Sequence, residues 1–286
     1  MTRGNPFPRL LALTAVLLFL LAGPAFAGEF ITTTDSNAKV WADYVLKGET
    51  ATWNGRVDAD GYATGDGTMR FLLNGKPAQV YQGEMNRGRY HGSGKFTFLD
   101  TGDVYEGQFV DGRFQGQGLL TRRDGSYYDG NWFAGLRNGQ GTHRAANGVV
   151  YEGQWLDGKQ HGSGVMTWPN GVIFAGEWLE GRQVKGAITR PDGNRYEGDL
   201  DRLTPHGQGT TTWKSGDSYS GDYVRGSMTG KGTWRFFNGY YYQGDFERGQ
   251  FHGSGALYTA DGRILQQGNW SNGKFVGTAP VEEAAK

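Results

Sequence analysis

The feature that most constrains the fold of this chain is a repeat of about 23 residues. Successive units start at the aromatic residues Tyr81, Tyr105, Tyr128, Tyr151, Phe174, Tyr196, Tyr219 and Tyr242. Each unit reads aromatic-x-Gly-x-(large apolar)-x-x-Gly, then three variable residues, Gly-x-Gly and a further Gly before the next start. A short, regular period of this kind is typical of repeat proteins in which each unit packs on its neighbours.

Glycine marks two turns in every unit, and the chain has 50 glycines. Pairs such as Asp111-Gly112 and Asn170-Gly171 supply the positive φ angles that tight hairpin turns need. The stretches between these turns, such as residues 151–155 and 164–168, each have the length of one strand. Two strands in 23 residues leave no room for a helix. Five glycines of the unit 151–173 are therefore assigned a structural role: Gly153, Gly158, Gly162, Gly164 and Gly171.

Strand alternation places Tyr151, Gly153 and Trp155 on one face, with Glu152 and Gln154 on the other. We expect rings from a neighbouring strand to cover the bare backbone of the glycine. The sequence predicts an all-β fold, an elongated, twisted, single-layer antiparallel meander of about 18 to 20 strands with a groove on its aromatic side.

The chain divides into six parts by pattern. These are a signal peptide (1–27), an N-terminal segment (28–50), a degenerate capping repeat (51–80), eight repeats (81–264), a partial capping repeat (265–277) and a tail (278–286). The glycine pattern breaks only at Val184 and Leu203, and the unit that begins at Phe174 is one residue short. We expect a local change of curvature there.

The unit 151–164 resembles the MORN signature Tyr-x-Gly-x-Trp-x-x-Gly-x-x-x-Gly-x-Gly, where MORN stands for membrane occupation and recognition nexus. The resemblance covers residues 81–264 well and 51–277 loosely. It implies stacked β-hairpins, and MORN units elsewhere accompany lipid kinase or methyltransferase domains. Outside the repeats this sequence has no stretch long enough for a catalytic domain, so we predict that the protein is not an enzyme.

The first 27 residues have the order of a secretory signal. Arg3 and Arg9 precede the apolar run 10–22, and Ala25-Phe26-Ala27 forms a small-residue cleavage box. The apolar run would span only about 20 Å as a helix, against about 30 Å for the hydrocarbon core of a bilayer. We therefore expect cleavage after Ala27 and a secreted or periplasmic protein.

Charge argues against a nucleic-acid partner. Removing residues 1–27 removes two of the 29 basic residues and none of the 29 acidic ones, which leaves a formal net charge of −2. Nucleic-acid binding relies on Lys and Arg that neutralise phosphates, and docking on anionic lipid also needs clustered cations. We expect no nucleic-acid partner.

Neither metal nor cofactor chemistry is indicated. Four histidines, His91, His161, His206 and His252, occupy the same position of the unit. Hairpins advance by about 9.5 Å, so the closest pair, two units apart, would lie about 19 Å apart, too far for one ion. The phosphate-loop-like stretches 92–95 and 230–233 lack the full spacing and the following helix. The prediction is therefore no metal and no cofactor.

The leading functional hypothesis is a scaffold whose aromatic groove binds a protein or peptide. The alternatives are peripheral association with a phospholipid membrane and binding of cell-wall glycan. Alternatively, the rings mainly cover one another as a thin core. The candidate binding residues are Tyr105, Phe109, Tyr128, Trp132, Tyr151, Trp155, Trp178, Tyr219, Tyr223, Tyr242 and Phe246.

We predict that the exported protein begins at Gly28, because the small residues before it fit the cleavage box and the apolar run is too short to stay inserted. The intact mass of the exported protein measures this directly. Recovery of the protein in a membrane pellet with residues 1–27 still attached would contradict the prediction.

Overall fold

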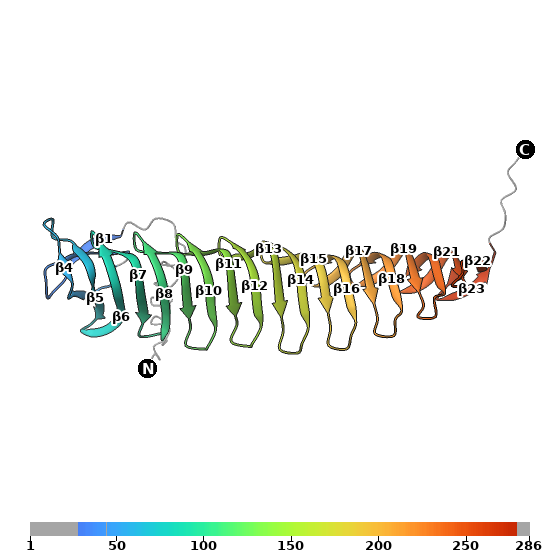
Figure 1. Cartoon of the computed structure of the whole chain (residues 1–286), viewed down its shortest axis with the longest axis horizontal. Coiled ribbons are helices and arrows are strands. Elements are labelled where there is room, and N and C mark those ends of the chain that lie inside the picture. The colour runs from blue at the N-terminus through green and yellow to red at the C-terminus, as the bar shows by residue number, and fades with distance from the viewer. Residues whose placement is uncertain (1–27, 44, 279–286) are drawn as a thin grey trace, which may run out of the picture. The chain divides into compact units, whose positions relative to one another are not determined.

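A computed structural model of the chain describes residues 28–43 and 45–278. The predicted signal peptide and most of the predicted tail lie outside these residues. The chain forms two compact units that divide after Lys159. All regular elements in the described residues are β-strands, and the strands of each unit follow one another in chain order (Figure 1).

The first unit is built from twelve strands. They are β1 (Glu29–Thr32), β2 (Lys39–Ala42), β3 (Glu49–Trp53), β4 (Arg56–Val57), β5 (Ala63–Leu73), β6 (Lys76–Asn86), β7 (Arg89–Phe98), β8 (Asp103–Val110), β9 (Arg113–Thr121), β10 (Tyr127–Phe133), β11 (Leu136–Arg144) and β12 (Val150–Leu156). Strands β1 and β2 form a separate two-stranded sheet, and β3 and β4 pair with β5. From β5 to β12 each strand pairs antiparallel with the next.

The second unit continues the same pattern in an open antiparallel sheet. Its strands are β13 (Lys159–Thr167), which starts one residue before the boundary, β14 (Ile173–Leu179), β15 (Arg182–Thr189), β16 (Arg195–Asp201), β17 (Thr204–Thr212), β18 (Ser218–Val224), β19 (Ser227–Arg235), β20 (Tyr241–Glu247), β21 (Gln250–Tyr258), β22 (Ile264–Ser271) and β23 (Lys274–Gly277). The predicted all-β antiparallel meander is confirmed. The strand number was underestimated, because β1 to β4 precede the regular glycine pattern.

The first turn of each 23-residue repeat is a two-residue turn with both residues at positive φ. Asp111 has φ 49° and Gly112 has φ 82°, which are the signs of a type I′ turn, the turn that matches the twist of paired strands. Of the structural glycines predicted in the unit 151–173, Gly158, Gly162 and Gly171 also have positive φ. Gly153 pairs with Gly141, and Gly164 pairs with Gly176.

A tyrosine ring lies across a pair of facing glycines in each regular hairpin. Gly83 pairs with Gly94, and a Cβ added to Gly94 would lie 2.5 Å from Cε2 of Tyr81. The Tyr81 hydroxyl donates to the Glu84 carbonyl at 2.6 Å. The expectation that a neighbouring strand supplies the ring over the first glycine was wrong, because the ring comes from two residues earlier on the same strand and reaches across to the facing glycine. The same contact is made by Tyr105, Tyr128, Tyr196, Tyr219 and Tyr242.

A bulge next to this contact explains the Gly-x-Gly pair. On β7, Gly92, with φ 58°, and Ser93 have no partner on β6, because Gly94 faces Gly83 and His91 already faces Glu84. In the shortened repeat that begins at Phe174, β15 has one residue without a partner on β14, Val184, in place of two. The missing residue is therefore absorbed as a shorter bulge, and the change of curvature stays a prediction.

The core is one layer of rings on one face of the sheet. In the first unit Tyr105 and Tyr128 each contact the large ring of their own strand and that of the next repeat, edge to face. Tyr105 lies 5.1 Å from Phe109 and 5.6 Å from Trp132, with interplanar angles of 82° and 86°. The indole of Trp132 donates to the Gly118 carbonyl at 2.9 Å. In the second unit Tyr219 repeats this pattern with its neighbours Tyr223 and Phe246.

The β1–β2 sheet packs on the β6–β7 turn of the first unit. The backbone N–H of Trp41 donates to the Gly88 carbonyl at 2.8 Å, and the Arg89 guanidinium lies 3.7 Å from the centroid of the Trp41 ring. Val40 is fully buried. Within the N-terminal segment 28–50, to which the sequence assigned no fold, residues 28–43 therefore cover the start of the repeats.

Leu203→Gly should stabilise the protein. Leu203 has φ 66° where the other units have glycine, and a left-handed conformation costs a side-chain-bearing residue about 1–2 kcal/mol, against about 0.5–1 kcal/mol for the extra entropy of glycine. We expect a gain of up to about 1 kcal/mol in unfolding free energy, measured by denaturant titration. Leu203→Ala removes the same side chain but keeps the strain, so an equal gain in that control would show that φ is not the cause.

The buried tyrosines should couple folding to alkaline pH. Burial raises the pKa of Tyr151, Tyr196 and Tyr242 to about 12, against about 10 in an unfolded chain. A raised folded pKa favours the neutral phenol, so this stability is present below about pH 10 and is lost as pH rises toward about pH 12. Tyrosinate absorbance and circular dichroism should therefore show one shared transition in that window. Tyr196→Phe should make this transition shallower, and the control Tyr240→Phe, which changes an exposed tyrosine, should not. Full ionisation of the tyrosines while the protein stays folded would refute the coupling.

Candidate binding surface

The aromatic residues predicted to line a groove lie in the core. Their exposed fractions run from 0% for Tyr105 to 4% for Trp155. The buried set includes all eleven: Tyr105, Phe109, Tyr128, Trp132, Tyr151, Trp155, Trp178, Tyr219, Tyr223, Tyr242 and Phe246. The rings cover one another and the glycine backbone, so they present no open surface in this structure.

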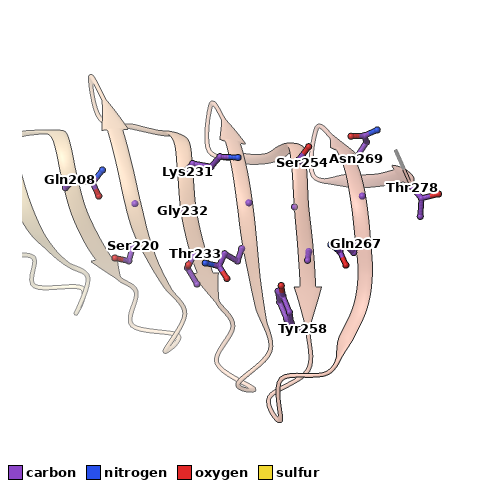
Figure 2. Close-up of a pocket in the computed structure, with 16 residues that line it drawn as sticks. Gln208, Ser220, Lys231, Gly232, Thr233, Ser254, Tyr258, Gln267, Asn269 and Thr278 are labelled. Carbon is purple, nitrogen blue, oxygen red and sulfur yellow. The ribbon is translucent and has the colours of Figure 1, made fainter. Parts of the chain in front are cut away.

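A groove lies on the opposite, polar face of the second unit, where it spans strands β17 to β22 (Figure 2). Its volume is about 1060 Å³. The prediction of a groove on the aromatic side was wrong, because the rings fill the space on their own side of the sheet. On the other face the short side chains of Ser220, Thr233 and Ser254 leave the space open.

The lining of this groove consists mainly of amides, hydroxyls and backbone. Gln208, Gln243, Gln267 and Asn269 contribute side-chain amides from three strands, β17, β20 and β22. Between them the backbone of glycines such as Gly244 reaches the surface of the groove. An arrangement of this kind offers both donors and acceptors to a polar ligand.

Charged groups at the groove are already paired. Nζ of Lys231 lies 2.5 Å from Oδ1 of Asp245, and the backbone N–H of Lys231 donates to Asp222 at 2.9 Å. Burial raises the pKa of Asp245, but hydrogen bonds from Lys231 and from the backbone of Ser254 outweigh it and hold the pKa below its usual value. The groove therefore suits an uncharged polar ligand better than an anion.

Exposed apolar side chains recur at the residue before the hairpin turn, on the face opposite the rings. In the first unit, Val110 is 44% exposed, Phe133 61% and Leu156 45%. In the second unit, Leu179 and Val224 occupy the same position and are about half exposed. Exposed apolar patches are typical of surfaces that bind proteins, membranes or other ligands.

The histidine positions show hydrogen-bonding and turn-flanking surroundings. Nε2 of His252 lies 3.2 Å from Oε2 of Glu247. Within residues 28–43 and 45–278, no group of three or more histidines and carboxylates is placed to hold a metal ion. The described part of the chain also contains no helix that could cross a membrane.

Two solved structures illustrate the similarity to known proteins. The TCP10 domain of CPAP from Danio rerio, solved with a peptide of STIL, is 10% identical with a TM-score of 0.34, covering 77% of this chain and 100% of that chain. The SAS-4 (dCPAP) TCP domain of Drosophila melanogaster, solved with a proline-rich motif of Ana2, is 13% identical with a TM-score of 0.31, covering 70% of this chain and 99% of that one. TM-scores this low do not establish a common function. No curated protein matches the chain.

The MORN-repeat family model matches more than half of the chain. The matched residues are 81–100, 105–127, 128–150, 151–173, 174–195, 196–218, 219–239, 242–262 and 267–278. These matches contain the tyrosine, the facing glycines and the type I′ turns described above. The chain therefore belongs to the MORN-repeat family.

Proposed function

We propose that this protein is a non-enzymatic scaffold that binds an extended peptide segment of a partner protein in the polar-face groove of the second unit. The observation that carries the proposal is the groove itself, which crosses six strands and is lined by amides, hydroxyls and backbone. Peptide backbone carries one donor and one acceptor per residue, so it complements such a lining along its whole length.

The spacing of the hairpins favours an extended ligand. Successive hairpins lie about 9.5 Å apart, and an extended peptide rises about 3.3 Å per residue. Three residues of a bound segment therefore span one repeat, which is the spacing between Gln243 and Gln267, two equivalent positions in successive repeats that both line the groove.

The row of exposed apolar residues supports a protein partner over the alternatives. Val224, which ends β18 and is about half exposed, would add apolar contact beside the polar groove of the second unit. Cell-wall glycan offers less to such a row. Association with anionic phospholipid would need clustered free cations, whereas Lys231 in the groove is paired with Asp245.

We also propose that the protein acts after export. The signal-like residues 1–27 support secretion or transfer to the periplasm with cleavage after Ala27. The partner would then be a protein of that compartment.

Photo-crosslinking from the groove tests the function. A photoreactive residue at Gln243, which lines the groove, should give protease-sensitive adducts with a protein of the same compartment. The matched control is Phe237, which is 75% exposed and lies in a loop outside the groove lining. Ser254→Trp, which fills the groove, should abolish the adducts from Gln243 without loss of fold.

Equal labelling from Gln243 and Phe237 would contradict a groove-specific partner. Flotation with anionic vesicles tests the membrane alternative, and we expect most of the protein to stay at the bottom of the gradient. Strong flotation together with an absence of protein adducts would favour the membrane function over the proposed one.

A further inference from the structure

One hairpin of the first unit, β10–β11, carries a cation where the others carry apolar or uncharged residues. In β8–β9, Phe114 stacks on Tyr105, with ring centroids 3.6 Å apart. The corresponding residue of β11 is Arg137, which pairs opposite Trp132. Its guanidinium carbon lies 4.3 Å from the centroid of the Trp155 ring. A charged group therefore sits on the core face of the sheet.

A second arginine and a histidine lie beside it. His143 faces Tyr128 in the register position that Leu120 holds in the preceding hairpin, and Arg122 follows the end of β9. Arg122, Arg137 and His143 together border a cavity of about 90 Å³. The rest of its lining is largely apolar and aromatic: Leu120, Ser126, Tyr127, Tyr128, Trp132, Gly135, Leu136 and Gly158.

The charges of this cluster are not balanced within the described residues. Burial lowers the pKa of Arg137, and the positive charge of Arg122 lowers it further, against an opposing effect of Tyr128. Burial also lowers the pKa of His143, with added contributions from Arg137 and Arg122. No carboxylate lines the cavity, and no ion pair or side-chain hydrogen bond joins Arg137 to any residue that the structure describes.

The carboxylate that interacts with the charge of Arg122 is already engaged by other groups. Asp124 interacts with the charge of Arg122, but its carboxylate accepts hydrogen bonds from the hydroxyl and the backbone N–H of Ser126 at 2.6 and 2.9 Å. A guanidinium carries five N–H donors, and a partly buried charge without a counter-ion is unfavourable. The cavity therefore has cationic N–H donors but no anionic group to accept their hydrogen bonds.

We propose that Arg122, Arg137 and His143 form a binding site for one carboxylate group. Space of about 90 Å³ corresponds to about three water molecules, which is the scale of a carboxylate with its adjoining carbon. Guanidinium groups match two carboxylate oxygens in plane. The remaining apolar walls, such as Leu120 and Leu136, would leave the extra oxygens of a phosphate without donors. The site lies in the first unit and does not depend on the groove of the second.

Thermal unfolding of the full chain in acetate tests this site, with chloride at the same ionic strength as the reference. A ligand at ten times its Kd stabilises by about 1.4 kcal/mol, so we expect acetate to raise Tm by about 3–5 °C. The imidazole resonance of His143, identified by its loss in His143→Gln, should shift on the same titration. A tetraglutamate peptide at equal carboxylate concentration compares a side-chain source with a free acid, and a response to either supports the site.

Arg137→Gln should abolish both the Tm rise and the shift of the His143 resonance. The matched control is Arg144→Gln, which removes an exposed arginine from the same strand and is absent from the cavity lining; it should leave both responses unchanged. If Arg137→Gln fails to fold, the Tm response of His143→Gln serves instead, and it should be reduced. Equal responses in all variants would overturn the site, and a larger response to inorganic phosphate than to acetate would overturn the carboxylate assignment.

Discussion

The packing of a tyrosine ring on two facing glycines is the contact on which the rest of the structure depends. Tyr105 covers Gly107 and Gly118, and any Cβ at either position would meet its ring or the facing backbone. The ring can lie flat only because both strands are bare at that point. Its hydroxyl then donates to the Gln108 carbonyl at 3.0 Å, at the bulge that the next glycine creates. Ring, glycine pair and bulge therefore require one another.

This contact also explains why the stability of each compact unit comes from contacts between neighbouring hairpins. A single-layer sheet has no second layer to bury its apolar face, so each hairpin must bury its rings against the next. Tyr128 does this by contacting both Trp132 and Trp155 at interplanar angles near 90°. Since each hairpin touches only its neighbours, stability is close to a sum of nearest-neighbour terms. The β1–β2 sheet matters for the same reason, because the first hairpins lack a preceding repeat.

Sequence periodicity was sufficient to predict the hairpins, the turns and the face shared by Tyr151 and Trp155. It could not predict which side of the sheet keeps open space. Alternation says which residues share a face, but the open side depends on side-chain volume after packing. Large rings consume the space on their own side, while Ser220 and Ser254 leave it free on the other. The candidate rings therefore form the buried core of the sheet, and the groove lies on the opposite face.

A repeat protein supplies its own internal comparison, which separates residues that hold the fold from residues that do something else. Phe114 and Phe251 occupy one position of the unit and stack on Tyr105 and Tyr242, so packing alone explains them. Arg137 occupies that same position and keeps a cation against the rings, at a cost that the fold does not require. Leu203 is a departure of another kind, because its strain is local to a turn. Arg137, by contrast, departs from the repeat pattern by placing a charge beside a cavity, and this departure therefore points to a ligand.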